Sequence, residues 1–116
     1  MLTIDALKEF GANTDEGMAR CLNKEAFYLR LVKTVPTEGN FQKLRDSIAA
    51  GDLTGAFEAA HSLKGILSNL SLTPISVPVG EMTEKLRART EMDYSEMLAE
   101  VEKQRAALEA ICAECV

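Results

Sequence analysis

Several residue types that β-rich proteins use heavily are scarce in this chain of 116 residues. It has no tryptophan, and aromatic residues make up only 5% of it, although 47% of its residues are hydrophobic. A core built mainly from leucine, isoleucine, valine, alanine and methionine suits packed helices better than a β-sandwich or barrel. We therefore expect an all-α protein, and the length fits a single domain over residues 1–116.

Long apolar runs and basic tracts are also missing. No stretch approaches the roughly 20 apolar residues that span a bilayer, so we expect no membrane segment. The start "MLTIDALKEF" has no basic segment followed by an apolar run, so we expect no secretory signal and a cytoplasmic location. A net charge of −5 without a Lys/Arg-rich tract argues against nucleic-acid binding. The start at Met1 favours a free-standing protein, and we expect a monomer.

Only three cysteines are present, two of them in the C-x-x-C spacing of Cys112 and Cys115. A redox motif of this type usually opens a helix beside a strand, and no strand pattern accompanies it here. A zinc site would have to recruit Cys21 and His61 as the remaining ligands. We favour apolar packing at the end of the last helix, which leaves disulfide formation on air oxidation and zinc binding as alternatives. We expect no bound metal or cofactor.

Apolar periodicity and capping residues predict helices along the whole chain. The clearest covers residues 53–70, because it follows a capping Asp52 and repeats apolar residues every three or four positions for nearly five turns. Short connections favour an antiparallel four-helix bundle over about residues 23–115, with short accessory helices in about residues 1–22. Two short helices are expected first, one over 4–10 between Thr3 and Gly11 and one from residue 14 or 15 to residue 22. A third is capped by Asn23 and ends at Pro36, and a fourth runs through Phe41 and ends at Gly51. The last long helix is capped by Asp93 or Ser95 and reaches residue 115.

Two of the three prolines fall in "SLTPISVPVG", after the long helix. Pro74 suits the first position of a helix capped by Thr73, but Pro78 would then remove an interior hydrogen bond. We therefore expect a loop or a kinked first turn here, with the next helix regular from Glu81.

His61 is the only histidine, and it lies within the long predicted helix. At about 100° per residue, its side chain points about 120° away from the apolar stripe, towards solvent. Gly65 lies one turn later on the same flank, where glycine costs roughly 0.5–1 kcal/mol relative to alanine. Because Gly65 points away from the core, close helix packing does not explain it. We interpret it as room for another molecule to approach the imidazole.

Lys64 indicates what that molecule carries. An ammonium near an imidazole makes a small positive site for an anion such as a phosphoryl group. Imidazole is also a competent nucleophile near neutral pH. The combination of His61, Lys64 and Gly65 is therefore typical of a histidine that is phosphorylated by a docking partner.

The same residues resemble a known family. "AAHSLKGILSNLSL" (residues 59–72) resembles the His-x-Leu-Lys-Gly signature of histidine-containing phosphotransfer (HPt) domains, which are modules of multistep phosphorelays. "IAAGDLTGAFEAAHSLKG" is similar to the lead-in of the family and "EMTEKLRART" to its following helix, so that the resemblance covers roughly residues 24–112. Two features depart from it: Ser71 stands where members usually have glycine, and "TPISVPV" is unusually rich in proline.

The resemblance implies a four-helix bundle with accessory N-terminal helices. It implies that His61 carries a phosphoryl group between the aspartates of receiver domains, in response regulators or hybrid sensor kinases. Lys64 would lie near the phosphoryl oxygens, and Gly65 would leave the gap that admits the receiver. On the same flank we expect three partner-binding residues, Phe57, Glu58 and Ser68.

In this interpretation the receiver supplies Mg²⁺, and the chain is a phosphoryl carrier rather than an enzyme. No Gly-rich phosphate loop is present, so we expect neither an ATP site nor kinase activity. The alternative is a helical adaptor, or a degenerate HPt module, that binds receivers without being phosphorylated.

Overall fold

The computed structural model describes residues 2–113, and these contain helices and no strand. The all-α prediction is therefore confirmed for this part of the chain. The helices are α1 (Ile4–Phe10), α2 (Thr14–Arg20), α3 (Glu25–Thr34), the short 3₁₀ helix η1 (Val35–Thr37), α4 (Gly39–Ala50), α5 (Leu53–Asn69), α6 (Thr73–Arg87) and α7 (Ser95–Ala113).

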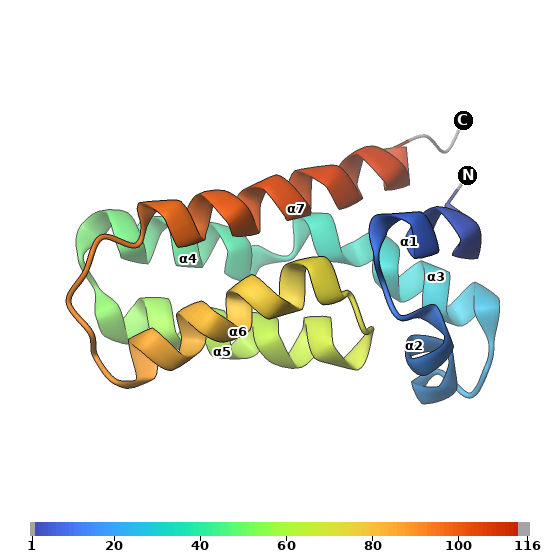
Figure 1. The fold of residues 1–116 in the computed structure, drawn as a ribbon, viewed down its shortest axis with the longest axis horizontal. Helices are drawn as coiled ribbons and strands as arrows, with labels where there is room; N and C mark the ends of the chain where they lie inside the picture. Colours follow the sequence, from blue (N-terminus) through green and yellow to red (C-terminus); the bar gives the residue numbers. More distant parts are fainter. Residues whose placement is uncertain (1, 114–116) are drawn as a thin grey trace.

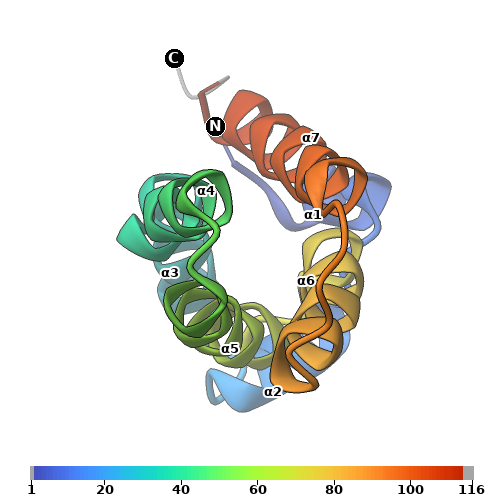
Figure 2. The same cartoon turned by 90° about the vertical axis from the view of Figure 1, so that its left-hand side faces the viewer.

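Four of these helices form an antiparallel bundle, as predicted. Seen along its length, α4, α5, α6 and α7 surround one core, and α1–α3 lie together at one end (Figures 1 and 2). α5 is the central element because it packs against both α4 and α6. The boundary between accessory and bundle segments near residues 22 and 23 stays a prediction.

Helix boundaries follow local backbone chemistry where the chain has strong capping residues. The Thr3 side chain accepts a hydrogen bond from the amide of Ala6, and the Asp52 side chain accepts one from that of Gly55. Gly11 and Gly51 end α1 and α4 with φ of 108° and 71°, in the left-handed region that glycine enters without strain. These four boundary residues match the predictions.

The predicted path between α2 and α3 is wrong in detail. α2 ends at Arg20, and Leu22 lies outside it, 77% exposed. Leu22 and Asn23 have φ of 58° and 55°, so Asn23 cannot take the extended conformation of an N-cap. Lys24 holds that position instead, without a side-chain cap bond.

The loop expected over Pro74 and Pro78 is wrong, because α6 begins at Thr73 and contains Pro78, and Leu72 rather than Thr73 is its N-cap. The alternative expectation, a kinked first turn, stays a prediction. Pro74 occupies the first turn, where a missing amide costs nothing, and Pro78 removes only one bond from the second turn. Complete burial of Ile75 and Val79 on the same helix offsets that loss.

The core is continuous across all the helices and contains no buried side-chain nitrogen or oxygen without a partner among the described residues. α5 supplies a fully buried stripe that includes Ala56, Ala60, Leu63 and Leu67, the face on which the orientation of His61 was predicted. The opposite face of α5 is thereby fixed towards solvent.

Outside the core, an ion-pair network joins α4 to α7. Glu102 pairs with Arg45 and with Arg105, whose Nε lies 2.8 Å from a Glu102 carboxylate oxygen. Burial alone would raise the pKa of Glu102, but the hydrogen bonds from both arginines outweigh it and bring the pKa below its usual value.

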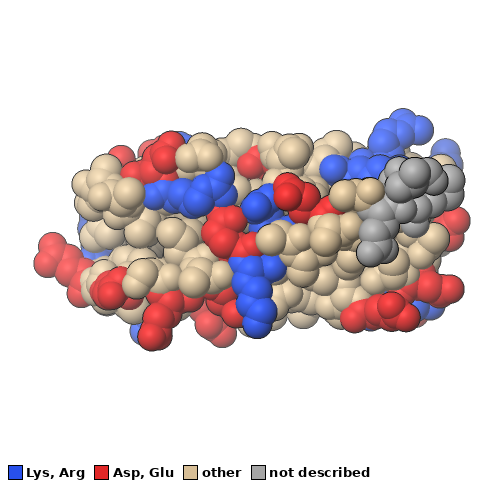
Figure 3. All heavy atoms as spheres, turned by 90° about the horizontal axis from the view of Figure 1, so that it is seen from above, with Lys and Arg blue, Asp and Glu red and all other residues tan. Residues whose placement is uncertain are grey.

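On the face seen in Figure 3, basic and acidic side chains lie next to one another rather than in one basic field. Within residues 2–113 no helix is long and apolar enough to cross a membrane.

Candidate functional site

The only imidazole of the chain is exposed on the outer face of α5, as predicted. Its ring stacks on that of Phe57, one turn earlier, with the centroids 5.6 Å apart and the planes 19° from parallel. Within residues 2–113 no hydrogen bond or ion pair engages the His61 ring. The imidazole is therefore held by one aromatic contact and is otherwise open to a partner.

Gly65 leaves a bare patch beside this ring. It is exposed, and a Cβ built on it would meet no atom within 4 Å outside its chain neighbours and the backbone of its own helix. Close packing inside the molecule therefore does not require glycine here. By contrast, a Cβ on Gly17 would lie 2.6 Å from the Tyr28 ring, so that glycine is required by packing. Gly65 costs helix stability without relieving any clash, which agrees with the predicted room for a partner.

Lys64 is partly buried on the flank of α5 that faces α6. Its positive charge contributes to lowering the pKa of Glu84 on α6, after the larger effect of the hydrogen bond from Arg87. The ammonium is therefore within electrostatic reach of α6 as well as one turn of helix from His61. This position agrees with the predicted cation near a phosphoryl group.

The predicted partner-binding residues lie at the edges of the same face. Phe57 is partly buried, Glu58 is exposed and pairs with Lys43 at 3.0 Å, and Ser68 is exposed near the end of α5. The Ser68 carbonyl accepts a hydrogen bond of 2.8 Å from Arg20. All three share the surface of His61, and their contact with a partner stays a prediction.

Two residues of α6 belong to this site although the sequence analysis did not identify them. The Arg87 guanidinium lies over the Phe57 ring, 5.1 Å from its centroid, and its Nε lies 3.0 Å from a Glu84 carboxylate oxygen. Only the register of α6 against α5 places them here. The missed signal was their spacing on one face of the predicted helix.

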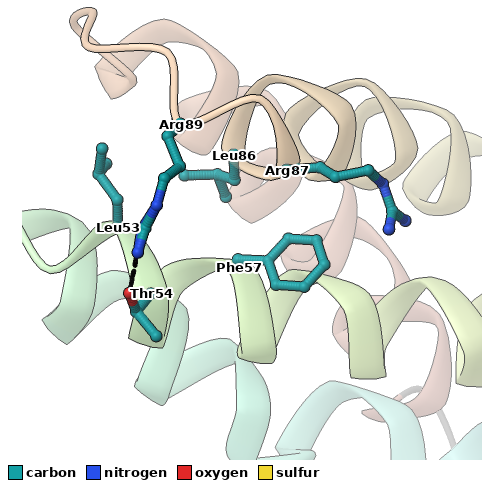
Figure 4. Close-up of a pocket in the computed structure, with 6 residues that line it drawn as sticks. All are labelled: Leu53, Thr54, Phe57, Leu86, Arg87 and Arg89. Atoms are coloured by element: carbon teal, nitrogen blue, oxygen red, sulfur yellow. Dashed lines mark hydrogen bonds between the residues drawn. The ribbon is translucent and has the colours of Figure 1, made fainter.

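A groove borders the site between α5 and α6. It has a volume of about 330 Å³, and Arg89 crosses it to donate two hydrogen bonds, of 2.9 and 3.2 Å, to the Thr54 hydroxyl (Figure 4). Arg89 has a left-handed φ of 54°, so it marks the end of α6 with some backbone strain. The groove is lined by Leu53, Thr54, Phe57, Leu86, Arg87 and Arg89.

Two residues of the alternative zinc site, Cys21 and His61, differ in exposure, and the site itself stays untested. Cys21 is buried and His61 exposed, and among the described residues no group of three or more His, Cys, Asp or Glu could hold a metal ion. Cys115 lies outside the described residues, so the pairing of Cys112 with Cys115 is not described.

Comparison with known proteins gives one match. The family model described as "Hpt domain" matches residues 37–113, which include α4 to α7 and therefore His61, Lys64 and Gly65. No curated protein and no solved structure matches the chain. Because the matched region is well over half of the chain and forms the expected bundle, the chain belongs to the Hpt domain family, whose members act in histidine phosphotransfer in phosphorelays.

Proposed function

We propose that this protein accepts a phosphoryl group on His61 from the aspartyl phosphate of one receiver domain and passes it to another. The observation that carries the proposal is the open imidazole beside the bare Gly65 patch. A domain-sized partner can reach the ring only where the helix surface has no protruding side chain. Family membership supports the type of chemistry.

In this proposal the transfer is an in-line exchange at phosphorus. A ring nitrogen of His61 forms a bond to phosphorus while the bond from phosphorus to the aspartate oxygen breaks, and the carboxylate leaves with the bonding electron pair. The reverse reaction with a second receiver returns the imidazole to its free state. The receivers supply Mg²⁺, and the chain needs no ATP site of its own.

Two side chains of the site have separate roles in the exchange. Phe57 limits the rotation of the imidazole through the stacked contact. Lys64 stabilises the negative charge on the phosphoryl oxygens in the transition state. We also propose that the protein is a monomer and acts in the cytoplasm.

The test is phosphotransfer profiling against the receiver domains of the source organism. Each receiver is phosphorylated with labelled phosphate and mixed with the wild-type chain or with His61→Ala. At least one receiver should transfer label to the wild type, in an acid-labile and alkali-stable form, and none to the variant. Receivers that bind the chain without transferring label would instead favour the adaptor alternative.

A further inference from the structure

Glu84 and Arg87 form an ion pair next to the proposed phosphorylation site. They lie three residues apart on α6, with Arg87 Nε 3.0 Å from a Glu84 carboxylate oxygen. Arg87 also covers the Phe57 ring at 5.1 Å, and Phe57 stacks on His61 at 5.6 Å. The pair is thus linked to the imidazole through a single aromatic ring.

Arg87 and the imidazole contact the same aromatic ring, so Arg87 lies near the position that a phosphoryl group on His61 would take. The sum of the two centroid distances limits the separation between its guanidinium carbon and the imidazole centre to about 11 Å. The Arg87 side chain extends past the Phe57 ring in the direction in which α5 runs from Thr54 to Phe57 (Figure 4). His61 is one turn further in that direction, and the Arg87 side chain is exposed, with Glu84 as its ion-pair partner.

Glu84 also influences the second cation of the site. The hydrogen bond from Arg87 is the largest cause of the lowered pKa of Glu84, and the Lys64 ammonium lowers it further. The Glu84 carboxylate therefore attracts both cations that flank His61 on the α6 side. A phosphoryl group on the imidazole would attract the same two cations, Arg87 and Lys64.

We infer that Glu84 competes with the phosphoryl group on His61 for Arg87 and Lys64, and so shortens the lifetime of the phosphorylated state. The inference rests on the proposed function and adds an element that sets how long His61 stays phosphorylated. On phosphorylation, Arg87 turns from Glu84 towards the phosphoryl oxygens.

The sign of the effect follows from charge. The doubly charged phosphoryl group loses negative charge as the P–N bond breaks, so a neighbouring carboxylate raises the energy of the phosphorylated protein more than that of the transition state for hydrolysis. Removing the carboxylate should therefore slow hydrolysis. Glu84 and Arg87 are exposed to solvent and ionic screening, and Lys64 is only partly buried, so the effect should be small, about threefold.

The experiment needs no partner protein. Phosphoramidate is used as the phosphoryl donor: its P–N bond breaks, a P–N bond to the imidazole forms, and ammonia leaves with a proton released by the ring. After removal of the donor, the phosphohistidine half-life is measured by ³¹P NMR for the wild type, Glu84→Gln, Arg87→Gln and the double variant. Glu100→Gln is the control, because it makes the same charge change on α7, where Glu100 accepts a hydrogen bond of 3.0 Å from Gln104 and has no other side-chain partner within residues 2–113.

Each variant has its own expected change in the phosphohistidine half-life. Glu84→Gln should lengthen the half-life about threefold, Arg87→Gln should shorten it, and the double variant should return towards the wild type. The Arg87 Nε–H resonance should also shift on phosphorylation. The half-lives of wild type and Glu84→Gln should become more similar in about 1 M salt, where the screening length is about 3 Å.

The outcomes separate this inference from the proposed function. If His61 is phosphorylated but Glu84→Gln decays like Glu100→Gln, and the Arg87 resonance does not move, competition by Glu84 is refuted and the proposed function stands. If the wild type takes up no phosphoryl group on His61, both are overturned. Circular dichroism of each variant checks that the bundle is intact.

Discussion

At the scale of single residues, the site presents an accessible nucleophile on a helix that is held in place. His61 is exposed on a helix whose opposite face is completely buried, so the position of the helix is fixed while the ring remains accessible. Its stacking on Phe57 limits rotation without covering the outer face of the site. Such a group can be orientated for attack on phosphorus by a partner that brings the rest of the chemistry.

Lys64→Ala should slow phosphotransfer roughly tenfold, because a charge-assisted contact to the phosphoryl oxygens is worth about 1.5–3 kcal/mol when fully formed. The thermal unfolding temperature should hardly change, because Lys64 lies at the edge of the core. Stopped mixing with a phosphorylated receiver measures the rate, and Lys103→Ala on the exposed face of α7 is the control. An unchanged rate in Lys64→Ala would remove its electrostatic role.

Gly65→Gln should raise stability by about 0.5–1 kcal/mol and block transfer from a receiver. The gain in stability arises because glycine is a poor helix former, and a Cβ at this position would clash with nothing outside the backbone of its own helix. Urea unfolding and the transfer assay are run on the same samples, with Ala106→Gln on α7 as a matched surface change. Normal transfer in a stabilised Gly65→Gln protein would show that clearance is not the function of this glycine.

At the scale of elements, residues of the accessory helices hydrogen-bond the turn between α5 and α6. Ser71, where the resemblance led us to expect glycine, has a left-handed φ of 54°. Its hydroxyl accepts a hydrogen bond of 2.6 Å from Arg20, and its carbonyl accepts one of 3.0 Å from the Asn13 amide. The accessory helices therefore hold a turn that a serine would not favour by itself.

Replacements at Ser71 separate the backbone strain from the side-chain bonds. Ser71→Ala should lose stability because it keeps the strained φ and removes the hydroxyl that bonds Arg20. Ser71→Gly loses the same bond but relieves strain worth about 1 kcal/mol. In chemical denaturation the free energy of unfolding of Ser71→Gly should therefore exceed that of Ser71→Ala by about 1 kcal/mol. The reverse order would mean that the turn is not strained.

Tyr28 braces the same turn from α3. It is fully buried, and its hydroxyl donates a hydrogen bond of 2.9 Å to the Leu70 carbonyl. Tyr28→Phe should cost about 1–3 kcal/mol, because a buried carbonyl loses its partner. Burial raises the pKa of this phenol from 10 to about 12. Its contribution is therefore complete below pH 10 and is lost as the pH rises towards 12.

The difference between wild type and Tyr28→Phe gives the check on that pH dependence. Their free energies of unfolding should converge between about pH 10 and pH 12. Groups that titrate in both proteins cancel in this comparison. A difference that stays constant over this range would mean that the Tyr28 phenol titrates alike in the folded and unfolded chains.

Elements with strong local signals could be predicted from the sequence, and those decided by packing could not. Asp52 and Gly51 set the boundary between α4 and α5 through side-chain and backbone chemistry that is local to the chain. The helical path through Pro78 depends instead on the burial of Ile75 and Val79 against other helices. Local propensity disfavours that path, so no local pattern could reveal it.

At the scale of the whole molecule, the bundle brings α6 alongside α5 and completes the site. The sequence predicted the positions of His61, Lys64 and Gly65, because one helical stripe fixes all three. Arg87 and Glu84 reach the site through the pairing of two helices, which are joined by the turn at Ser71. Sequence periodicity predicts which face of a helix is buried, but not its register against a neighbour.

The most direct test is to locate the phosphoryl group itself. The chain is incubated with a phosphorylated receiver, digested under alkaline conditions that preserve phosphohistidine, and mapped by mass spectrometry. We expect one modified residue, His61, and loss of the modification when a second, unphosphorylated receiver is added. A phosphoryl group on any other residue, or an unmodified His61 with every receiver that binds, would contradict it.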